Sequence, residues 1–391
     1  MHFRTFLTVL FVPLVLGFDR KIISKLNPGC ERCNTTLVYT QAVGSHDTIH
    51  QIWDFTRGMP TIIFAVGSTN STIKVLWEDT EPKSFELSEK PQYSFALAAK
   101  AIYEYNDLKD DAQFSKDLPH RIYPFDRFTW TLNASSLGTP TEATAKLHSS
   151  YFRKGVEKNC VDFKMVFLPY SDYGALLPHL VHSANSTLLD IDLVNLTTSR
   201  DYNSSRFALH FVMVSTDDEF DQMRLRMRKS LDDEHTPGVF EIIEVRSPAS
   251  ANSGAGAFLQ FRPVAYTQTV RSVDTSTVVR TSSFNRSSLP PYSSLRVFYR
   301  DFDHRQLLVQ DFFINFGESG DGFYDRHNYT SWSFTLGYGA PPIEGFSSFV
   351  IMIISIGLGV PVLLALSGIV YVLVRRMRAR NRPERLTEDM E

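Results

Sequence analysis

Short stretches in which apolar and polar residues alternate dominate residues 18–345. Residues 71–77, STIKVLW, show the pattern clearly. A period of two places one face of a strand in a core and the other face in water. Comparable stretches, separated by polar turns, lie at residues 48–55, 61–68, 71–78, 161–170, 187–196, 206–215, 239–245, 295–301 and 331–339. So many short strands with frequent turns predict antiparallel β-sandwiches.

The length of this β-rich stretch predicts more than one domain. A sandwich holds roughly 100–150 residues, so the body needs two. Polar, turn-rich segments between residues 138 and 156 place the boundary there. The expected fold class is all-β, with two antiparallel β-sandwich-like domains at residues 18–150 and 151–345.

Two stretches of the body depart from the alternating pattern. Residues 93–108, YSFALAAKAIYEYNDL, could form a helix, although their Tyr, Phe and Ile content leaves a strand open. Residues 247–257, SPASANSGAGA, are rich in turn residues and lie between two strand-like runs. We expect them to form a hairpin loop.

The N-terminus carries the pattern of a signal peptide. Arg4 gives a short basic start, and residues 6–16 form an apolar run that is too short to cross a bilayer. We expect a signal peptide at residues 1–17, cleaved after Gly17.

The C-terminus carries a second and longer apolar run. Residues 349–374 contain no charge and would span about 39 Å as a helix, more than the roughly 30 Å hydrocarbon core of a bilayer. Six arginines follow: Arg375, Arg376, Arg378, Arg380, Arg382 and Arg385. Such a cluster remains on the cytosolic side. We therefore expect a transmembrane helix at residues 347–374, a cytosolic tail at residues 375–391, and a lumenal body in a type I topology.

Composition excludes one large class of function. The chain has 391 residues and a formal net charge of −3, which argues against a nucleic-acid binder. Hydrophobic residues make up 43% of the chain and aromatic residues 13%, enough for a substantial core.

Sequons for N-glycosylation are frequent in the predicted lumenal part. Eight of the 14 asparagines precede X-Ser or X-Thr, and none of these eight lies in the tail. The candidates are Asn34, Asn70, Asn133, Asn185, Asn195, Asn203, Asn285 and Asn328. The excess indicates a surface that carries carbohydrate, with the crowded Asn203 a candidate for an unused site.

Three cysteines, Cys30, Cys33 and Cys160, leave one odd thiol in a lumenal body. Cys30 and Cys33 have the spacing of half a zinc site or of a redox motif. No second ligand pair follows, however, and a Pro-Gly lead-in surrounds them. We favour one structural disulfide in which Cys160 pairs with Cys30 or with Cys33.

Candidate chemistry is sparse. The chain contains no G-x-S-x-G nucleophile motif, no His-Glu-x-x-His zinc motif and no phosphate loop. Residues 317–327 offer Glu318, Asp321, Asp325 and His327 but lack the ligand spacing of a calcium hand, and tight turns need Gly and Asp anyway. We expect no catalytic residue, no cofactor and no metal site.

A cluster of three acids and a histidine, Asp232 to His235, precedes a Thr-Pro-Gly turn and a strand at residues 239–245. Adjacent acids point to opposite sides of an extended chain, which does not suit a glycosidase pair. We interpret the cluster as the solvated approach to a type II turn at Pro237-Gly238.

Several motifs, in the same order along nearly the whole body, resemble the glycosylated lysosomal membrane protein family. They are HQIWDF (50–55), residues 62–66, STIKVLW (71–77), SLDDEHTPGVFE (230–241), FRPVAYTQ (261–268) and FYDRHNYTSWSFTLGYGAPPIEGFS (323–347). The resemblance implies a heavily glycosylated lysosomal type I membrane protein with no known catalytic activity. It also implies an accessory subunit of a major-facilitator dipeptide transporter, which it shields from lysosomal proteases.

The chain departs from the family pattern in two respects. The vertebrate pattern has more cysteines in the second half of the body, where this chain has none after Cys160. The family's tail ends in a tyrosine-based sorting signal, whereas the only nearby tyrosine here, Tyr371, lies within the predicted span. We expect this chain to reach the lysosome together with its partner.

Small residues in the predicted span suggest how a transporter helix would be recognised. Helices associate in lipid where small residues let backbones approach. Ser355, Gly357, Gly359 and Pro361 are the candidates for this contact. A lumenal hydrolase and a cell-surface adhesion or receptor module remain the alternative functions, and a homo-oligomer stays open.

Overall fold

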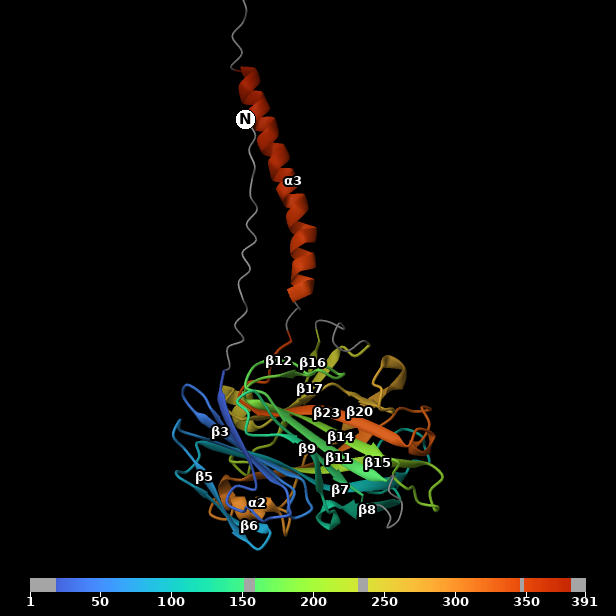
Figure 1. The fold of residues 1–391 in the computed structure, drawn as a ribbon. Helices are drawn as coiled ribbons and strands as arrows, with labels where there is room; N and C mark the ends of the chain where they lie inside the picture. Colours follow the sequence, from blue (N-terminus) through green and yellow to red (C-terminus); the bar gives the residue numbers. More distant parts are fainter. Residues whose placement is uncertain (1–18, 151–158, 231–237, 345–347, 381–391) are drawn as a thin grey trace, which may run out of the picture. The chain divides into compact units, whose positions relative to one another are not determined.

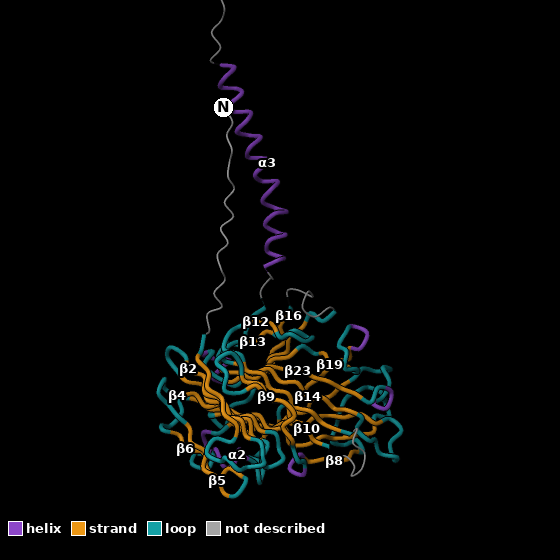
Figure 2. Tube along the Cα trace, in the orientation of Figure 1, coloured by secondary structure: helices purple, strands orange, loops and turns teal. Residues whose placement is uncertain are grey.

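The computed structural model describes residues 19–150, 159–230, 238–344 and 348–380 (Figure 1). Strands predominate in the part before residue 344, and a single long helix follows it (Figure 2). The all-β prediction and the C-terminal helix are therefore confirmed. The signal peptide predicted at residues 1–17 and the end of the tail lie outside the described residues.

The first large sheet is antiparallel and contains the longest strand of the body. Its order is β1 (Lys21–Leu26), β2 (Leu37–Val43), β3 (Thr48–Asp54), β4 (Thr61–Gly67), β7 (Tyr93–Asn106), β15 (Ser205–Ser215) and β22 (Leu308–Phe316). A further strand, β8 (His120–Pro124), pairs with the second half of β7. The short strand β21 (Asn285–Arg286) pairs with β22.

The second large sheet is also antiparallel. Its order is β9 (Thr131–Ser136), β10 (Ala143–Ser149), β11 (Cys160–Phe167), β14 (Ser186–Val194), β23 (Tyr329–Tyr338), β18 (Ala257–Phe261), β17 (Glu241–Arg246) and β16 (Arg224–Lys229). A link to the first sheet runs from β23 through β19 (Val264–Tyr266) and β20 (Ser276–Thr281) to β22.

The remaining elements are small. They are the hairpins β5 (Ile73–Glu78) with β6 (Glu81–Leu87) and β12 (Asp172–Tyr173) with β13 (Val181–His182), the helices α1 (Pro248–Ser253) and α2 (Ser294–Phe298), and the 3-10 turns η1 (Phe125–Arg127), η2 (Val273–Thr275), η3 (His304–Gln306) and η4 (Tyr324–Arg326). The short helix α1 lies in the connection between the antiparallel strands β17 and β18. The hairpin loop expected at residues 247–257 is therefore confirmed.

The main core lies between the two large sheets. Phe211 of β15 packs against Trp332 of β23, with ring centroids 6.0 Å apart. Phe55, which follows β3, meets Phe163 of β11 edge to face at 5.8 Å. All four side chains are at most 3% exposed. Because each of these contacts joins one sheet to the other, the body is a two-sheet sandwich.

The structure does not divide the body at residue 150 as the sequence predicted. The body up to Ile343 forms one compact unit. The reason is pairing across the expected boundary, because β7 of the first half pairs with β15 of the second half over eleven positions. In addition, β9 and β10 of the first half form one end of the second sheet.

Within residues 93–108, Tyr93–Asn106 form the strand β7, so the helical alternative is wrong. Phe95 and Leu97 of β7 face the main core, whereas Ala96 and Ala98 face a second hydrophobic cluster on the other side of the first sheet. A strand buried on both faces reads as a continuous apolar run without alternation. This double burial explains why its pattern admitted a helix.

The second cluster explains another difference. The strand expected at residues 295–301 is instead the short helix α2. Leu295, Phe298 and Tyr299 are all at most 4% exposed and pack into this cluster, where Phe298 meets Phe85 of β6 at 5.8 Å. A spacing of three and four residues places them on one helical face. This signal was present in the sequence and was missed.

The long helix α3 covers Ser348–Arg380. Its residues 350–380 form a helix that is long and apolar enough to cross a membrane. Compared with the predicted span of 347–374, the helix continues past the first arginines. Long arginine side chains tolerate this position because they can extend toward the headgroups.

Candidate functional site: the sequon surface, the cysteines and the apolar helix

Seven of the eight sequon asparagines are exposed on the body, and Asn185 alone is half-buried. Several stand in turns. Asn195 and Asn328 both have a positive φ, 50° and 54°, and the backbone N–H of Asn195 donates to the carbonyl of Asn328 over 2.7 Å. Carbohydrate on these two residues would therefore leave the surface side by side. Glycosylation itself stays a prediction, which the exposure of the side chains supports.

The half-buried Asn185 is the sequon with the least accessible side chain. Its Oδ1 accepts a hydrogen bond of 2.7 Å from Nε of Arg20. Arg20 is only 8% exposed and forms an ion pair with Asp47 over 2.7 Å. Asn203, which the sequence suggested as an unused site, is exposed. Asn185 is therefore the better candidate for a sequon without carbohydrate.

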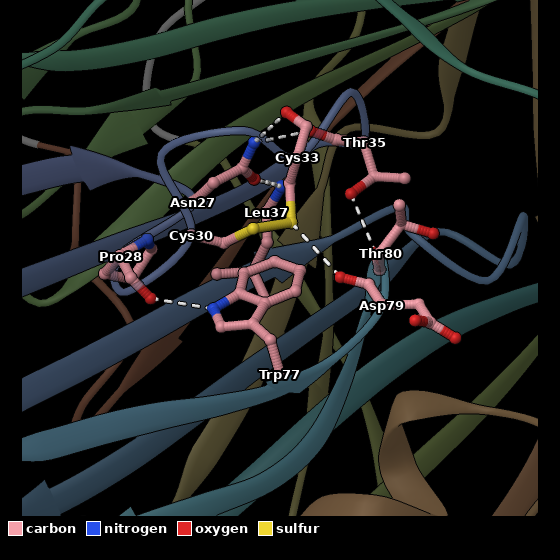
Figure 3. Close-up of a disulfide and its surroundings, with 9 residues drawn as sticks. All are labelled: Asn27, Pro28, Cys30, Cys33, Thr35, Leu37, Trp77, Asp79 and Thr80. Atoms are coloured by element: carbon pink, nitrogen blue, oxygen red, sulfur yellow. Dashed lines mark hydrogen bonds between the residues drawn. A yellow bond between two sulfur atoms is a disulfide. The ribbon is translucent and has the colours of Figure 1, made fainter.

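The disulfide joins Cys30 to Cys33, so the predicted pairing of Cys160 is wrong (Figure 3). The loop between β1 and β2 turns sharply at Asn27 and Gly29, whose φ angles are 44° and 87°. The Asn27 side chain accepts from the Leu37 N–H and donates to the Thr35 carbonyl. The local turn thus brings the two cysteines together without any distant strand.

The disulfide loop is also fixed to the β5–β6 hairpin. Trp77 Nε1 donates to the carbonyl of Pro28 over 2.9 Å, and the Thr35 hydroxyl donates to the carbonyl of Thr80 over 2.9 Å (Figure 3). These contacts give the disulfide a structural position at one edge of the first sheet.

Cys160 is the free cysteine and lies at the start of β11 in the second sheet. Burial, followed by the nearby carboxylates Asp162 and Asp192, raises the pKa of this thiol to about 11. The thiol therefore stays protonated and is a poor nucleophile. This observation disfavours a cysteine hydrolase at this position.

His148, Cys160 and Asp162 form a group that the sequence analysis missed. Their potential ligand atoms lie within 4.8 Å of one another, because β10 and β11 place His148 opposite Asp162. The His148 Nδ1 is 2.7 Å from Asp162 Oδ1, and the Lys146 ammonium is 3.1 Å from the other carboxylate oxygen. The Asp162 carboxylate is thus already shared by His148 and Lys146. The pairing register of β10 and β11 was the signal that could have revealed these three residues as a group.

The glycine-rich turn at residues 317–327 has a structural role. Gly317, Gly320 and Gly322 all have positive φ angles, as a tight turn requires. Asp321 accepts a hydrogen bond from Arg206 over 3.0 Å and others from Thr277 and the Glu318 N–H. The acid is therefore held by neighbours within the body.

Arg206 is the centre of this ion-pair network. It is 4% exposed and binds Asp107 at 2.8 Å, Asp110 at 2.6 Å and Asp321 at 3.0 Å. Its three partners come from segments that are about 100 residues away in the sequence. The network ties the end of β7 to the turn after β22.

The acidic stretch Asp232–His235 lies outside the described residues. The residues around it are described, and β16 pairs with β17 in an antiparallel hairpin that encloses it. Gly238 has a φ of 81°, but Pro237 lies outside the described residues, so the turn expected at Pro237-Gly238 stays a prediction.

Burial shifts several titratable groups in the body. Burial lowers the pKa of His50 to about 4, despite the opposing charge of Glu89. Burial raises the pKa of the Asp54 and Asp192 carboxyls, against hydrogen bonds from Ser294 and Ser331 respectively. These groups lie in the two-sheet body rather than around an open cleft, and we interpret them as structural.

The small residues of α3 lie on different faces of the helix. A Cβ added at Gly357, Gly359 or Gly368 would meet no atom within 4 Å. Ser355 and Gly359 are four residues apart and share one face, whereas Gly357 and Pro361 share a face about 200° away around the helix. The pair Ser355 and Gly359 therefore has the small-xxx-small spacing that helix contacts in lipid use.

A β-sandwich with exposed sequons, followed by one apolar helix, defines the class of the protein as a single-pass membrane glycoprotein. A sequence model of the glycosylated lysosomal membrane protein family matches residues 36–379. The chain belongs to this family, as its motifs indicated.

Curated relatives agree with the family match. Glycosylated lysosomal membrane protein A of Xenopus laevis is 31% identical over 377 residues, which cover 92% of this chain and 90% of the relative. Glycosylated lysosomal membrane protein B of the same species is 30% identical over 387 residues, 90% of each chain. The protein of that family in Danio rerio is 30% identical over 382 residues, 93% of this chain and 91% of the relative. The chain is a lysosomal membrane glycoprotein, and its family is not a known enzyme family.

Proposed function

We propose that the protein is a non-catalytic accessory subunit of a major-facilitator dipeptide transporter in the lysosomal membrane. In this role, α3 binds a helix of the transporter in type I orientation, and the glycosylated body covers the transporter's lumenal loops. A protease must reach an extended stretch of chain, and bulky glycans on a folded sandwich deny that access.

The observation that carries the proposal is the small-residue face of α3. A lone anchor needs apolar length only, whereas Ser355 and Gly359, four residues apart in α3, offer a close backbone approach to another helix. The two-sheet body adds the second part of the role, because seven of its eight sequon asparagines are exposed, at separate places along the chain.

The link between the body and α3 supports a shield that stays near the membrane. The carbonyl of Pro342 accepts hydrogen bonds from Arg228 and Gln260, at 3.4 Å and 3.3 Å, so the chain is fixed to the body up to this residue. Six residue steps separate Pro342 from Ser348, and six extended steps reach at most about 22 Å.

A non-catalytic role agrees with the chemistry of the body. The Cys160 thiol is held protonated, and the carboxylates of Asp162, Asp192 and Asp321 have lysine, hydroxyl and arginine partners respectively. Among these three described carboxylates, none lacks a partner.

The experiment is affinity purification of the full-length chain in mild detergent, followed by identification of the proteins that accompany it. We expect a major-facilitator transporter in the wild-type sample. Gly359→Leu should lower its recovery several-fold, and the matched control Gly357→Leu on the opposite face should retain it. Equal recovery with both variants would exclude the small-residue face as the contact.

A further inference from the structure

One cavity of the body is lined by residues from its C-terminal part and contains none of the three cysteines. It has a volume of about 470 Å³ and is formed where β21, α2, η3 and β22 meet on the outer side of the first sheet. Leu289, Tyr299 and Leu307 form apolar parts of its wall and are themselves at most 9% exposed. A cavity of this size is within the range that holds a small organic molecule.

The rim of the cavity is strongly basic. Arg286, Arg296, Arg300 and His304 line it, and the single acid among its lining residues is Glu219. These exposed side chains come from separate elements, β21, α2, the turn after α2 and η3. The fold therefore gathers the positive charge of three arginines at one rim, which attracts an anion.

None of the three arginines forms an ion pair with a described carboxylate. The Arg286 guanidinium lies over the Phe220 ring at 5.6 Å, and Arg300 donates to the carbonyl of Lys83 over 2.7 Å. Arg206, by contrast, binds three carboxylates. The charge of the cavity thus remains available to a ligand.

We propose that this cavity binds a small organic anion, one that carries a phosphate or carboxylate group on a body of about the size of one sugar. Guanidinium groups match both anions through paired hydrogen bonds. Ser287 and Ser288 add hydroxyls to the lining, and Leu307 and Val309 provide apolar contact for the uncharged part of the ligand. This binding activity is independent of the accessory role proposed above.

A sequon for N-glycosylation adjoins the rim of the cavity. Arg286 directly follows the sequon residue Asn285, which is exposed. Carbohydrate at Asn285 would stand beside the cavity and could cover it. Binding is therefore measured both with the natural sequon and in an Asn285→Gln background.

The test uses the full-length protein in mild detergent at low ionic strength and titrates it calorimetrically with glucose 6-phosphate and with glucuronic acid. Uncharged glucose is the control probe. We expect saturable binding of at least one charged probe and none of glucose. Arg296→Gln should weaken that binding about 10-fold, and the double variant Arg286→Gln/Arg296→Gln should abolish it.

The matched control variant is Arg224→Gln, which removes an exposed arginine from β16, outside the cavity. It should bind as tightly as the wild type. Arg296→Lys, which keeps the charge but loses the paired hydrogen bonds, should lie between the wild type and Arg296→Gln. Thermal unfolding without probe verifies that each variant is folded.

Three results would overturn the proposal. They are no saturable binding of either charged probe in both backgrounds, equal binding of glucose, or an equal loss in Arg224→Gln. The last result would show attraction to basic surface in general, rather than recognition by this cavity.

Discussion

Large apolar side chains are buried in the body and exposed on the helix. In the body, Trp53 and Trp332 are fully buried between strands. In α3, Leu358 and Leu364 are 68% and 66% exposed, and none of the most apolar stretch of the helix is buried by described residues. The body therefore satisfies its apolar surface from its own chain, whereas the helix depends on lipid or on another protein.

Polar groups show the complementary difference. The buried Arg206 of the body is paired with three acids. The helix keeps charge out of its apolar stretch and gathers arginines only at its end. An unpaired charge is costly both in a protein core and in a bilayer. The body meets this cost by pairing, and the helix avoids it by excluding charge from its apolar stretch.

The largest effect should follow from removing the helix. Deletion of residues 348–391 should move essentially all of the protein from the membrane fraction to the soluble fraction, because no other described helix can cross a bilayer. Fractionation after an alkaline wash measures this. Retention of the truncated chain in the washed membranes would show that the body carries an anchor of its own.

The next largest effect should distinguish the two regions by stability. Trp332→Ala should lower the free energy of unfolding of the body by about 3–5 kcal/mol. The removed indole would leave an empty space among Phe211, Phe261 and Phe334 in the main core. The matched change Leu364→Ala in α3 should alter it by less than about 0.5 kcal/mol. Denaturant unfolding followed by circular dichroism measures both, and a comparable loss in Leu364→Ala would contradict the comparison.

Within the body, the disulfide should contribute a smaller increment. Cys30 and Cys33 close a loop of only four residues, so Cys33→Ser should cost about 2 kcal/mol by the chain-entropy estimate. Cys160→Ala is the control and should leave the sensitivity of the protein to reducing agent unchanged. If Cys160→Ala instead removed that sensitivity, the observed pairing would be wrong.

The smallest effect concerns pH and also belongs to the body. The pKa of folded His50 is about 4, below the value of about 6.5 in an unfolded chain. Neutral His50 thus contributes stability that is fully present above pH 6.5 and is lost as the pH falls toward 4. The raised pKa values of Asp54 and Asp192 act in the opposite direction. The wild type must therefore be compared with His50→Gln, rather than considered alone.

We expect His50→Gln to lose about 1–2 kcal/mol less stability than the wild type between pH 7 and pH 5. Denaturant midpoints at the two pH values measure the difference. Parallel losses in both proteins would show that His50 is not the group responsible.

The sequence predicted those parts of the fold that depend on local pattern. The alternation at residues 71–77 predicted the strand β5, and the uncharged run at residues 349–374 predicted α3. Both signals are local, since each depends only on which side chains of one short segment face water and which face an apolar surrounding. The strand β7 was ambiguous because its two faces meet two different hydrophobic clusters, and only the complete fold supplies both.

The same limit explains the errors about domains and cysteines. The pairing of β7 with β15 joins residues about 100 positions apart, and no local pattern encodes it. The Cys30–Cys33 disulfide depends on the positive φ angles of Asn27 and Gly29 and on contacts to the β5–β6 hairpin. The basic cavity likewise combines β21, α2, η3 and β22, whose side chains converge only in the folded body.

The proposed accessory role gives the comparison its functional meaning, since the helix would bind the partner and the body would protect it. The most direct test is a pulse-chase measurement of the transporter's half-life in cells with and without this protein. We predict that its removal shortens the half-life several-fold and that inhibitors of lysosomal proteases restore it. An unchanged half-life without the protein would contradict the account.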